Sequence, residues 1–142
     1  MSRINYGRLV AAGLAAGFVA NLFDFVTNGF LLADDAVAMA QRLNLDQAAM
    51  NSTSTLVAWI VIDFIYGLVI VFTYAGIRPR FGPGPKTAIL AGLVPFVAVA
   101  SVMYGFMAMG IFTTDMYIKS TALALVTNVA ASLAGGATYK EV

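Results

Sequence analysis

The polar residues with the clearest capacity for chemistry lie in the stretch ANLFDFVTNGFLL, an otherwise apolar run near the start of the chain. This stretch carries the carboxyl group of Asp24 between the amides of Asn21 and Asn28. Gly13, Gly17, Asn21, Asp24 and Asn28 follow one another at spacings of four, four, three and four residues. At 3.6 residues per turn they form one stripe on a helix, and its GxxxG start allows helix backbones to approach closely in lipid. We therefore expect the polar side chains to face other parts of the protein.

A second carboxyl group, that of Asp63, lies in another apolar stretch at a matching depth. Asp24 and Asp63 are about eight and about seven residues from the outer ends of their segments, so both lie roughly 10–12 Å below the surface. No Lys or Arg is available at that depth, so a close pair of acids needs a proton, a metal cation or water. We expect at least one of the two to be protonated at pH 7, in a cation or proton site or a polar cavity.

Four more side chains are candidates for the same ligand or ion site: Asn21, Asn28, Tyr66 and Tyr104. A structural role is the alternative, in which protonated Asp24 and Asp63 hydrogen-bond between helices for only about 0.6 kcal/mol on average. Asn or Ser would serve that purpose at lower cost, so the functional interpretation is preferred and the structural one stays open. The residues expected in helix packing are Gly13, Gly17, Gly67, Asn128 and Ser132.

The composition is that of a membrane protein. Of the 142 residues, 61% are hydrophobic and only 11% are charged, and the mean hydropathy is +0.86. A soluble domain carries roughly a quarter charged residues. The net charge of +1 also argues against nucleic acid as a partner.

The absence of Cys and His from the sequence removes several kinds of chemistry. It excludes disulfides, thiolate nucleophiles, most zinc, copper and haem ligands, and the commonest general base. We expect no cofactor, and the lack of a catalytic motif argues against an enzyme. An intramembrane enzyme acting on lipid or quinone through the Asp pair, or through a metal bound to it, stays an alternative.

Four apolar segments are long enough to cross a bilayer, which takes about twenty residues. Their approximate bounds are 9–32, 56–77, 87–109 and 117–139. Between the first two, Ala36, Met39, Ala40 and Leu43 fall at helical spacing and predict a short amphipathic helix. The predicted fold is all-α: one domain, a four-helix transmembrane bundle with an interfacial helix between spans 1 and 2. A signal peptide is an alternative for the first segment, disfavoured because the apolar character resumes through Leu32.

Basic residues near the segment ends predict the orientation. Six lie on one side, namely Arg3, Arg8, Arg78, Arg80, Lys86 and Lys140, and two on the other, namely Arg42 and Lys119. We therefore expect a multi-pass protein of the inner (plasma) membrane with both termini cytoplasmic. Arg78, Arg80 and Lys86 are also candidates to hold anionic lipid headgroups, although the topology signal alone explains them.

The layout resembles that of small four-span integral membrane proteins of bacteria that have no assigned function. The matching features are the INYGRLVAAG entry to the first span and the glycine–proline turn FGPGP. This resemblance covers the whole chain in layout but rests on no specific motif, and it implies no activity. Small multidrug exporters also place one acid in their first span, as Asp24 is here, but their surrounding sequence pattern is absent.

The leading hypothesis is a small membrane transport or ligand-binding protein for a cation, a proton-coupled solute or a small ligand. Asp24 and Asp63 would form its polar site. The alternative is a non-catalytic subunit or assembly protein of a larger membrane complex. The expected partners are membrane lipid and either further copies of the chain or the subunits of such a complex.

Overall fold

The computed structural model describes residues 4–140, and every regular element within that range is a helix. The elements are α1 (Tyr6–Val26), the π-helical turn η1 (Thr27–Leu31), α2 (Ala33–Arg42), α3 (Gln47–Met50), α4 (Thr53–Phe81), α5 (Pro85–Ala108) and α6 (Thr114–Thr138). Four helices, with α1 continuing into η1, are long and apolar enough to cross a membrane. The prediction of an all-helical chain with four long apolar helices is therefore confirmed for the described residues.

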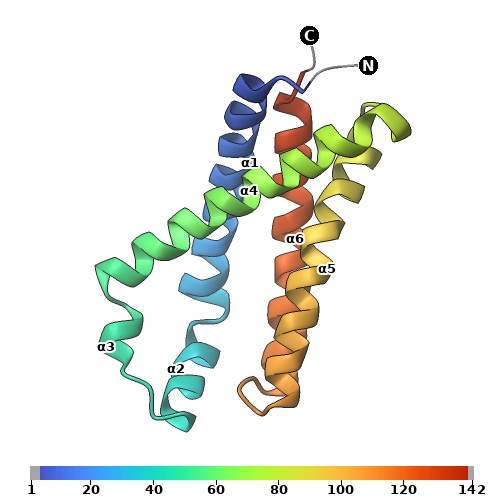
Figure 1. Ribbon diagram of the computed structural model, residues 1–142. Helices are drawn as coiled ribbons and strands as arrows, with labels where there is room; N and C mark the ends of the chain where they lie inside the picture. Colours follow the sequence, from blue (N-terminus) through green and yellow to red (C-terminus); the bar gives the residue numbers. More distant parts are fainter. Residues whose placement is uncertain (1–3, 141–142) are drawn as a thin grey trace.

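The four long helices form a bundle in which α1 packs mainly on α4 and α6, and α5 packs on α6 and α4. The start of α1, the α4–α5 turn and the end of α6 lie together at what we call the terminal end (Figure 1). At the opposite end, called the loop end, lie α2, α3 and the connection between α5 and α6. Helix α4 crosses the others obliquely, so its first half leans away from α5 and α6 toward the loop end (Figure 1).

Local sequence explains where these helices begin. The Ser52 hydroxyl accepts a hydrogen bond from the backbone N–H of Thr55 at 3.4 Å, an N-cap that satisfies one of the amides exposed at the start of α4. At the other end of the bundle, Gly84 has a φ of 137°, a conformation that favours glycine. Pro85 follows in the first turn of α5, where its missing N–H costs nothing. The glycine–proline sequence therefore supplies the tight α4–α5 turn.

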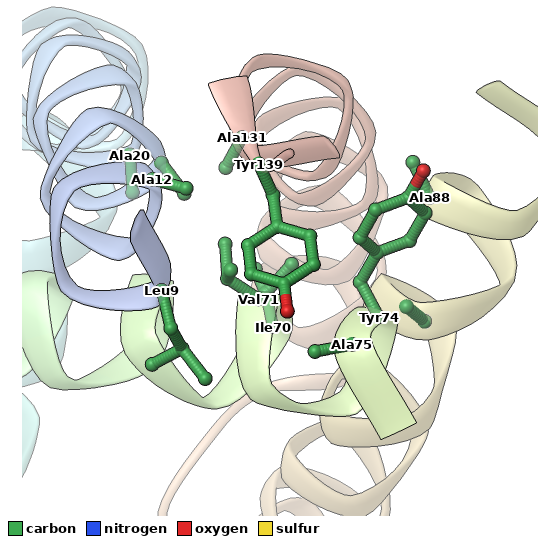
Figure 2. Close-up of a cluster of buried hydrophobic side chains, with 12 residues drawn as sticks. Leu9, Ala12, Ala20, Ile70, Val71, Tyr74, Ala75, Ala88, Ala131 and Tyr139 are labelled. Carbon is green, nitrogen blue, oxygen red and sulfur yellow. The ribbon is translucent and has the colours of Figure 1, made fainter. Parts of the chain in front are cut away.

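Small residues make up much of the bundle core, which lets the helices approach closely (Figure 2). Those with at most 2% of their surface exposed include Ala12, Ala16, Ala20, Ala88, Ala91 and Ala131. Toward the terminal end the core becomes aromatic, where the rings of Tyr74 and Tyr139 meet edge to face at 6.0 Å (Figure 2). The Tyr74 hydroxyl accepts a hydrogen bond from the N–H of Gly84 at 3.2 Å, which ties the α4–α5 turn to the core.

The observed long helices begin before the apolar segments seen in the sequence, and the second also ends after its segment. The second spans Thr53–Phe81 rather than 56–77 and contains Pro79 near its end. Hydropathy marks only the part compatible with lipid, whereas caps and turns decide the helix ends. The expected short helix after the first segment is present as α2, Ala33–Arg42. The π-helical turn Thr27–Leu31 was not predicted.

Candidate functional site

A backbone-to-backbone contact between α1 and α4 positions the candidate site. A Cβ atom added to Gly67 would collide with the backbone N of Gly17 and would lie 2.5 Å from the carbonyl oxygen of Gly13. The reverse contacts are equally tight, because a Cβ on Gly17 would lie 2.7 Å from the Cα of Phe64. No side chain fits between the helices here, so the glycines set their separation and their relative height.

Asn21 continues this contact one turn toward the loop end. Its Nδ2 donates to the carbonyl oxygens of Gly17 at 3.0 Å and of Ile60 at 3.3 Å. Both amide hydrogens are thereby used, the first within α1 and the second across to α4. The cross-helix bond holds the α4 turn that carries Ile60 and Asp63 against the α1 turn that carries Asn21 and Asp24.

Asp24 contacts Thr127 of α6, a residue that was not among the candidates predicted from the sequence. The Thr127 Oγ1 lies 3.3 Å from Asp24 Oδ1 and also 3.3 Å from the carbonyl oxygen of Leu123, one turn earlier in its own helix. Thr127 is buried and Asp24 is half-buried. The only sequence signal for Thr127 was its place beside Asn128, because a threonine in an apolar helix commonly bonds only its own backbone.

The half-buried Asp63 of α4 lies within electrostatic range of Asp24, and so does Tyr66, one turn further along α4. The Tyr66 hydroxyl bonds the Oδ1 of Asn128 at 3.1 Å, which joins α4 to α6. Asp24, Asp63 and Tyr66 are therefore brought together from two helices. The third helix, α6, supplies Thr127 and Asn128.

Two of the other candidate residues, Asn28 and Tyr104, form contacts with groups other than the carboxyl groups of Asp24 and Asp63. The exposed Asn28 donates from Nδ2 to the backbone carbonyl of Asp24 at 3.0 Å, so its amide bonds its own helix. Tyr104 is 56% exposed, and its ring packs edge to face on Tyr117 at 5.9 Å. Because Tyr117 precedes Thr127 by ten residues of α6, or about 15 Å, Tyr104 lies toward the loop end and away from the carboxyl groups.

The terminal-end side of the site is a fully buried contact between α5 and α6. Asn128 and Ser132 are each 1% exposed, and the Ser132 hydroxyl donates to the Asn128 carbonyl at 2.6 Å. A Cβ atom on Gly92 would overlap Ser132 Oγ and would lie 2.9 Å from Asn128 Nδ2. Within residues 4–140 that Nδ2 is buried without a hydrogen-bond acceptor, so only the Oδ1 of this amide is satisfied.

A second polar contact joins α2 to the loop end of the bundle. The guanidinium of Arg42 donates to two successive carbonyl oxygens, from Nη1 to Gly110 at 2.7 Å and from Nη2 to Ile111 at 2.6 Å. Lys119 lies 2.6 Å from a carboxylate oxygen of Asp115 and 3.5 Å from one of Asp35. Helix α2 is therefore fixed to the α5–α6 connection by an arginine that satisfies free carbonyls beyond a helix end.

Charge and cavity geometry define what surrounds the two acids. Among the described residues neither Asp24 nor Asp63 has an ion pair, and no three His, Cys, Asp or Glu residues are grouped to hold a metal. A groove of about 370 Å³ lies between α1, η1 and α6, with a mostly apolar lining of Leu22, Phe23, Val26, Thr27, Leu31, Leu123 and Val126. A cavity of about 220 Å³ lies under α2, lined by Asp35, Ala38, Met39, Arg42, Thr113 and Met116. Neither space is lined by a carboxyl group of the pair.

The basic residues considered for lipid headgroups lie near the terminal end, on α4 and at the start of α5. The Arg78 guanidinium lies 5.9 Å from the ring centre of Tyr139 and is half-buried, whereas Arg80 and Lys86 are exposed. The cluster is therefore divided, with only two of the three side chains facing outward. Arg3, counted with them for the orientation, lies outside the described residues.

Comparisons with protein families, with curated proteins and with solved structures find no match for this chain.

Proposed function

We propose that this chain is a multi-pass protein of the inner (plasma) membrane, with the terminal end and both termini in the cytoplasm. Support comes from four helices of sufficient length and apolarity and from the described basic residues on the terminal side, namely Arg8, Arg78, Arg80, Lys86 and Lys140. In this orientation α2 lies at the outer membrane interface, with Asp34 in its first turn and Arg42 in its last. The exposed Arg80 and Lys86 then lie among the inner headgroups, where anionic lipid attracts them.

We propose further that Asp24 and Asp63 form the polar site of a small transport or ligand-binding protein whose ligand is a proton or a small cation. The single observation that carries this proposal is the position of the two acids. They lie on neighbouring turns of α1 and α4 that the Asn21–Ile60 hydrogen bond holds together, and no basic side chain is paired with either in residues 4–140. An acid at the centre of a membrane helix costs about 2.5–3.5 kcal/mol on insertion scales, so the pair needs a compensating positive partner.

Ion flux across proteoliposomes tests this function. Wild type, Asp24→Asn and Asp63→Asn are reconstituted with an internal pH indicator, and a membrane potential is imposed in buffers of Na⁺, K⁺ or choline. We expect wild type to move protons or one of the cations and both variants to lose at least 90% of that flux. Asp34→Asn is the matched control, because Asp34 is an exposed acid on α2 and its loss leaves the pair intact. Equal flux in all four proteins would contradict the proposal.

A second function, a non-catalytic subunit or assembly protein of a larger membrane complex, is favoured by a different observation. One segment in the first half of α4 is exposed on all its faces, since every residue from Leu56 to Ile62 is exposed. A partner helix, from a second copy or another subunit, would cover this segment. This function predicts that Asp24→Asn and Asp63→Asn are tolerated, whereas polar substitutions at the exposed Ile60 or Val61 dissociate a complex seen by native mass spectrometry.

A further inference from the structure

The Thr127 hydroxyl lies between two acceptors but has only one hydrogen to donate. Asp24 Oδ1 and the Leu123 carbonyl oxygen are both 3.3 Å from its oxygen. A hydroxyl rotates freely, donates one hydrogen bond and accepts up to two. It therefore bonds the carboxyl group and the backbone carbonyl in two alternative patterns that share the same heavy-atom positions.

The two patterns match the two charge states of Asp24. When Asp24 is ionised it is an acceptor only, and Thr127 turns its hydrogen toward Oδ1. When Asp24 is protonated it donates to the Thr127 oxygen, and Thr127 turns its hydrogen toward the Leu123 carbonyl. Every donor then has an acceptor in both states, so the carboxyl group gains or loses a proton without moving a helix.

We propose that the ligand of the site is a proton, carried by Asp24, and that Thr127 is the positioning residue that serves both of its charge states. This inference rests on the function proposed above and names its ligand class. A proton needs only one acceptor and a neighbouring group that can both donate and accept a hydrogen bond. Asp24 and Thr127 supply these two groups. Ca²⁺ needs six to eight oxygen ligands and Mg²⁺ a near-ideal octahedron, and the described residues group fewer than three acids together.

The other described groups near Asp24 do not bond its carboxyl group, so proton exchange involves Asp24 and Thr127. From α4, Asp63 and Tyr66 lie within electrostatic range of Asp24, and the Tyr66 hydroxyl is already bonded to Asn128. From α6 the nearest cation along the helix is Lys119, eight residues or about 12 Å toward the loop end. The two asparagine amides of its own helix donate to backbone carbonyls rather than to the carboxyl group. Thr127 is the one donor that the structure places within hydrogen-bonding distance of that carboxyl, within residues 4–140.

Infrared difference spectroscopy of the full chain in lipid vesicles tests the assignment. Wild type, Thr127→Ser and Thr127→Val are titrated over the pH range in which the carboxyl bands change, and the Asp24 band is identified by its loss in Asp24→Asn. Valine has nearly the shape of threonine without the hydroxyl, so packing is preserved. Thr127→Ala, which removes bulk as well, replaces it if helix content by circular dichroism falls.

We expect the protonated Asp24 band of Thr127→Val to move to higher wavenumber, since the carboxyl loses its hydrogen-bond acceptor. The ionised form becomes harder to populate, and proton flux in vesicles falls at least tenfold. Thr127→Ser keeps the hydroxyl and retains both the wild-type band and at least half of the flux. A purely structural threonine would lower thermal stability in the valine variant without moving the Asp24 band.

Three results would overturn parts of this account in distinguishable ways. If the wild-type carboxyl titrates and Thr127→Val titrates identically, the role of Thr127 is refuted while the site stands. If Na⁺, K⁺ or Mg²⁺ at fixed pH displaces the Asp24 band, the ligand is a cation and the proton assignment is refuted. If no carboxyl band responds to pH or to any cation, the proposed function itself is refuted.

Discussion

Substituting Gly67 by Ala tests the contact that positions the whole site. The added Cβ would lie 2.5 Å from the Gly13 carbonyl oxygen, and ordinary contacts begin at 3.4 Å, so α1 and α4 must separate by about 0.9 Å. The opposing atoms belong to the backbone and cannot swing aside. Overpacking of this kind costs about 1–3 kcal/mol. Separation by that amount also breaks the Asn21–Ile60 hydrogen bond, now 3.3 Å long, for about 1 kcal/mol more.

We therefore expect Gly67→Ala to lower the free energy of unfolding by about 2–4 kcal/mol. The assay is reversible unfolding in mixed micelles, followed by helix content as the denaturing detergent fraction rises. Gly76→Ala is the matched control on the same helix, because a Cβ there meets no atom within 4 Å. Alanine should stabilise the helix at that exposed position by about 0.5–1 kcal/mol. Equal effects of the two substitutions would refute the glycine contact and, with it, the common height of the two acids.

Two further substitutions test other parts of the geometry. Tyr66→Phe removes the hydrogen bond to the buried Asn128 and should lower the free energy of unfolding by about 1–3 kcal/mol in the same assay. Tyr104→Phe, on an exposed ring, is the control and should be neutral. Similar effects of the two substitutions would contradict the Tyr66–Asn128 contact. Arg42→Lys loses the paired bonds to the Gly110 and Ile111 carbonyls, so amide hydrogen exchange in α2 should quicken at least tenfold while α6 is unchanged. Unchanged exchange in α2 would show that the arginine does not fix that helix.

The sequence predicted the four long apolar helices, because these depend on local periodicity. Hydropathy over about twenty residues identifies a long apolar helix, and four of these are present. The spacing from Gly13 through Asp24 placed these residues on one side of α1, which is the side that contacts α4 and α6. Regular helix geometry suffices for such inferences.

The remaining site residues depended on tertiary features that local periodicity does not encode. The π-helical turn that begins at Thr27 adds residues per turn, so Asn28 no longer continues the stripe. Tyr104 lies in the last turns of α5, where its ring packs on Tyr117 at the start of α6 instead of facing the acids. Thr127 lies about 100° around α6 from Asn128, and only the packing of α1 against α6 shows that it contacts Asp24.

Reaction with a membrane-soluble carbodiimide shows directly whether Asp24 and Asp63 exchange a proton. This reagent modifies protonated carboxyl groups in an apolar environment, and mass spectrometry of peptides assigns the modified residue. We expect Asp24 or Asp63 in lipid vesicles to react faster than the exposed Asp34, and we expect a higher pH to slow the reaction as the proton is lost. If both acids stay unmodified at every pH, or react at a rate indifferent to pH, they do not exchange a proton and the polar stripe serves only to hold the helices together.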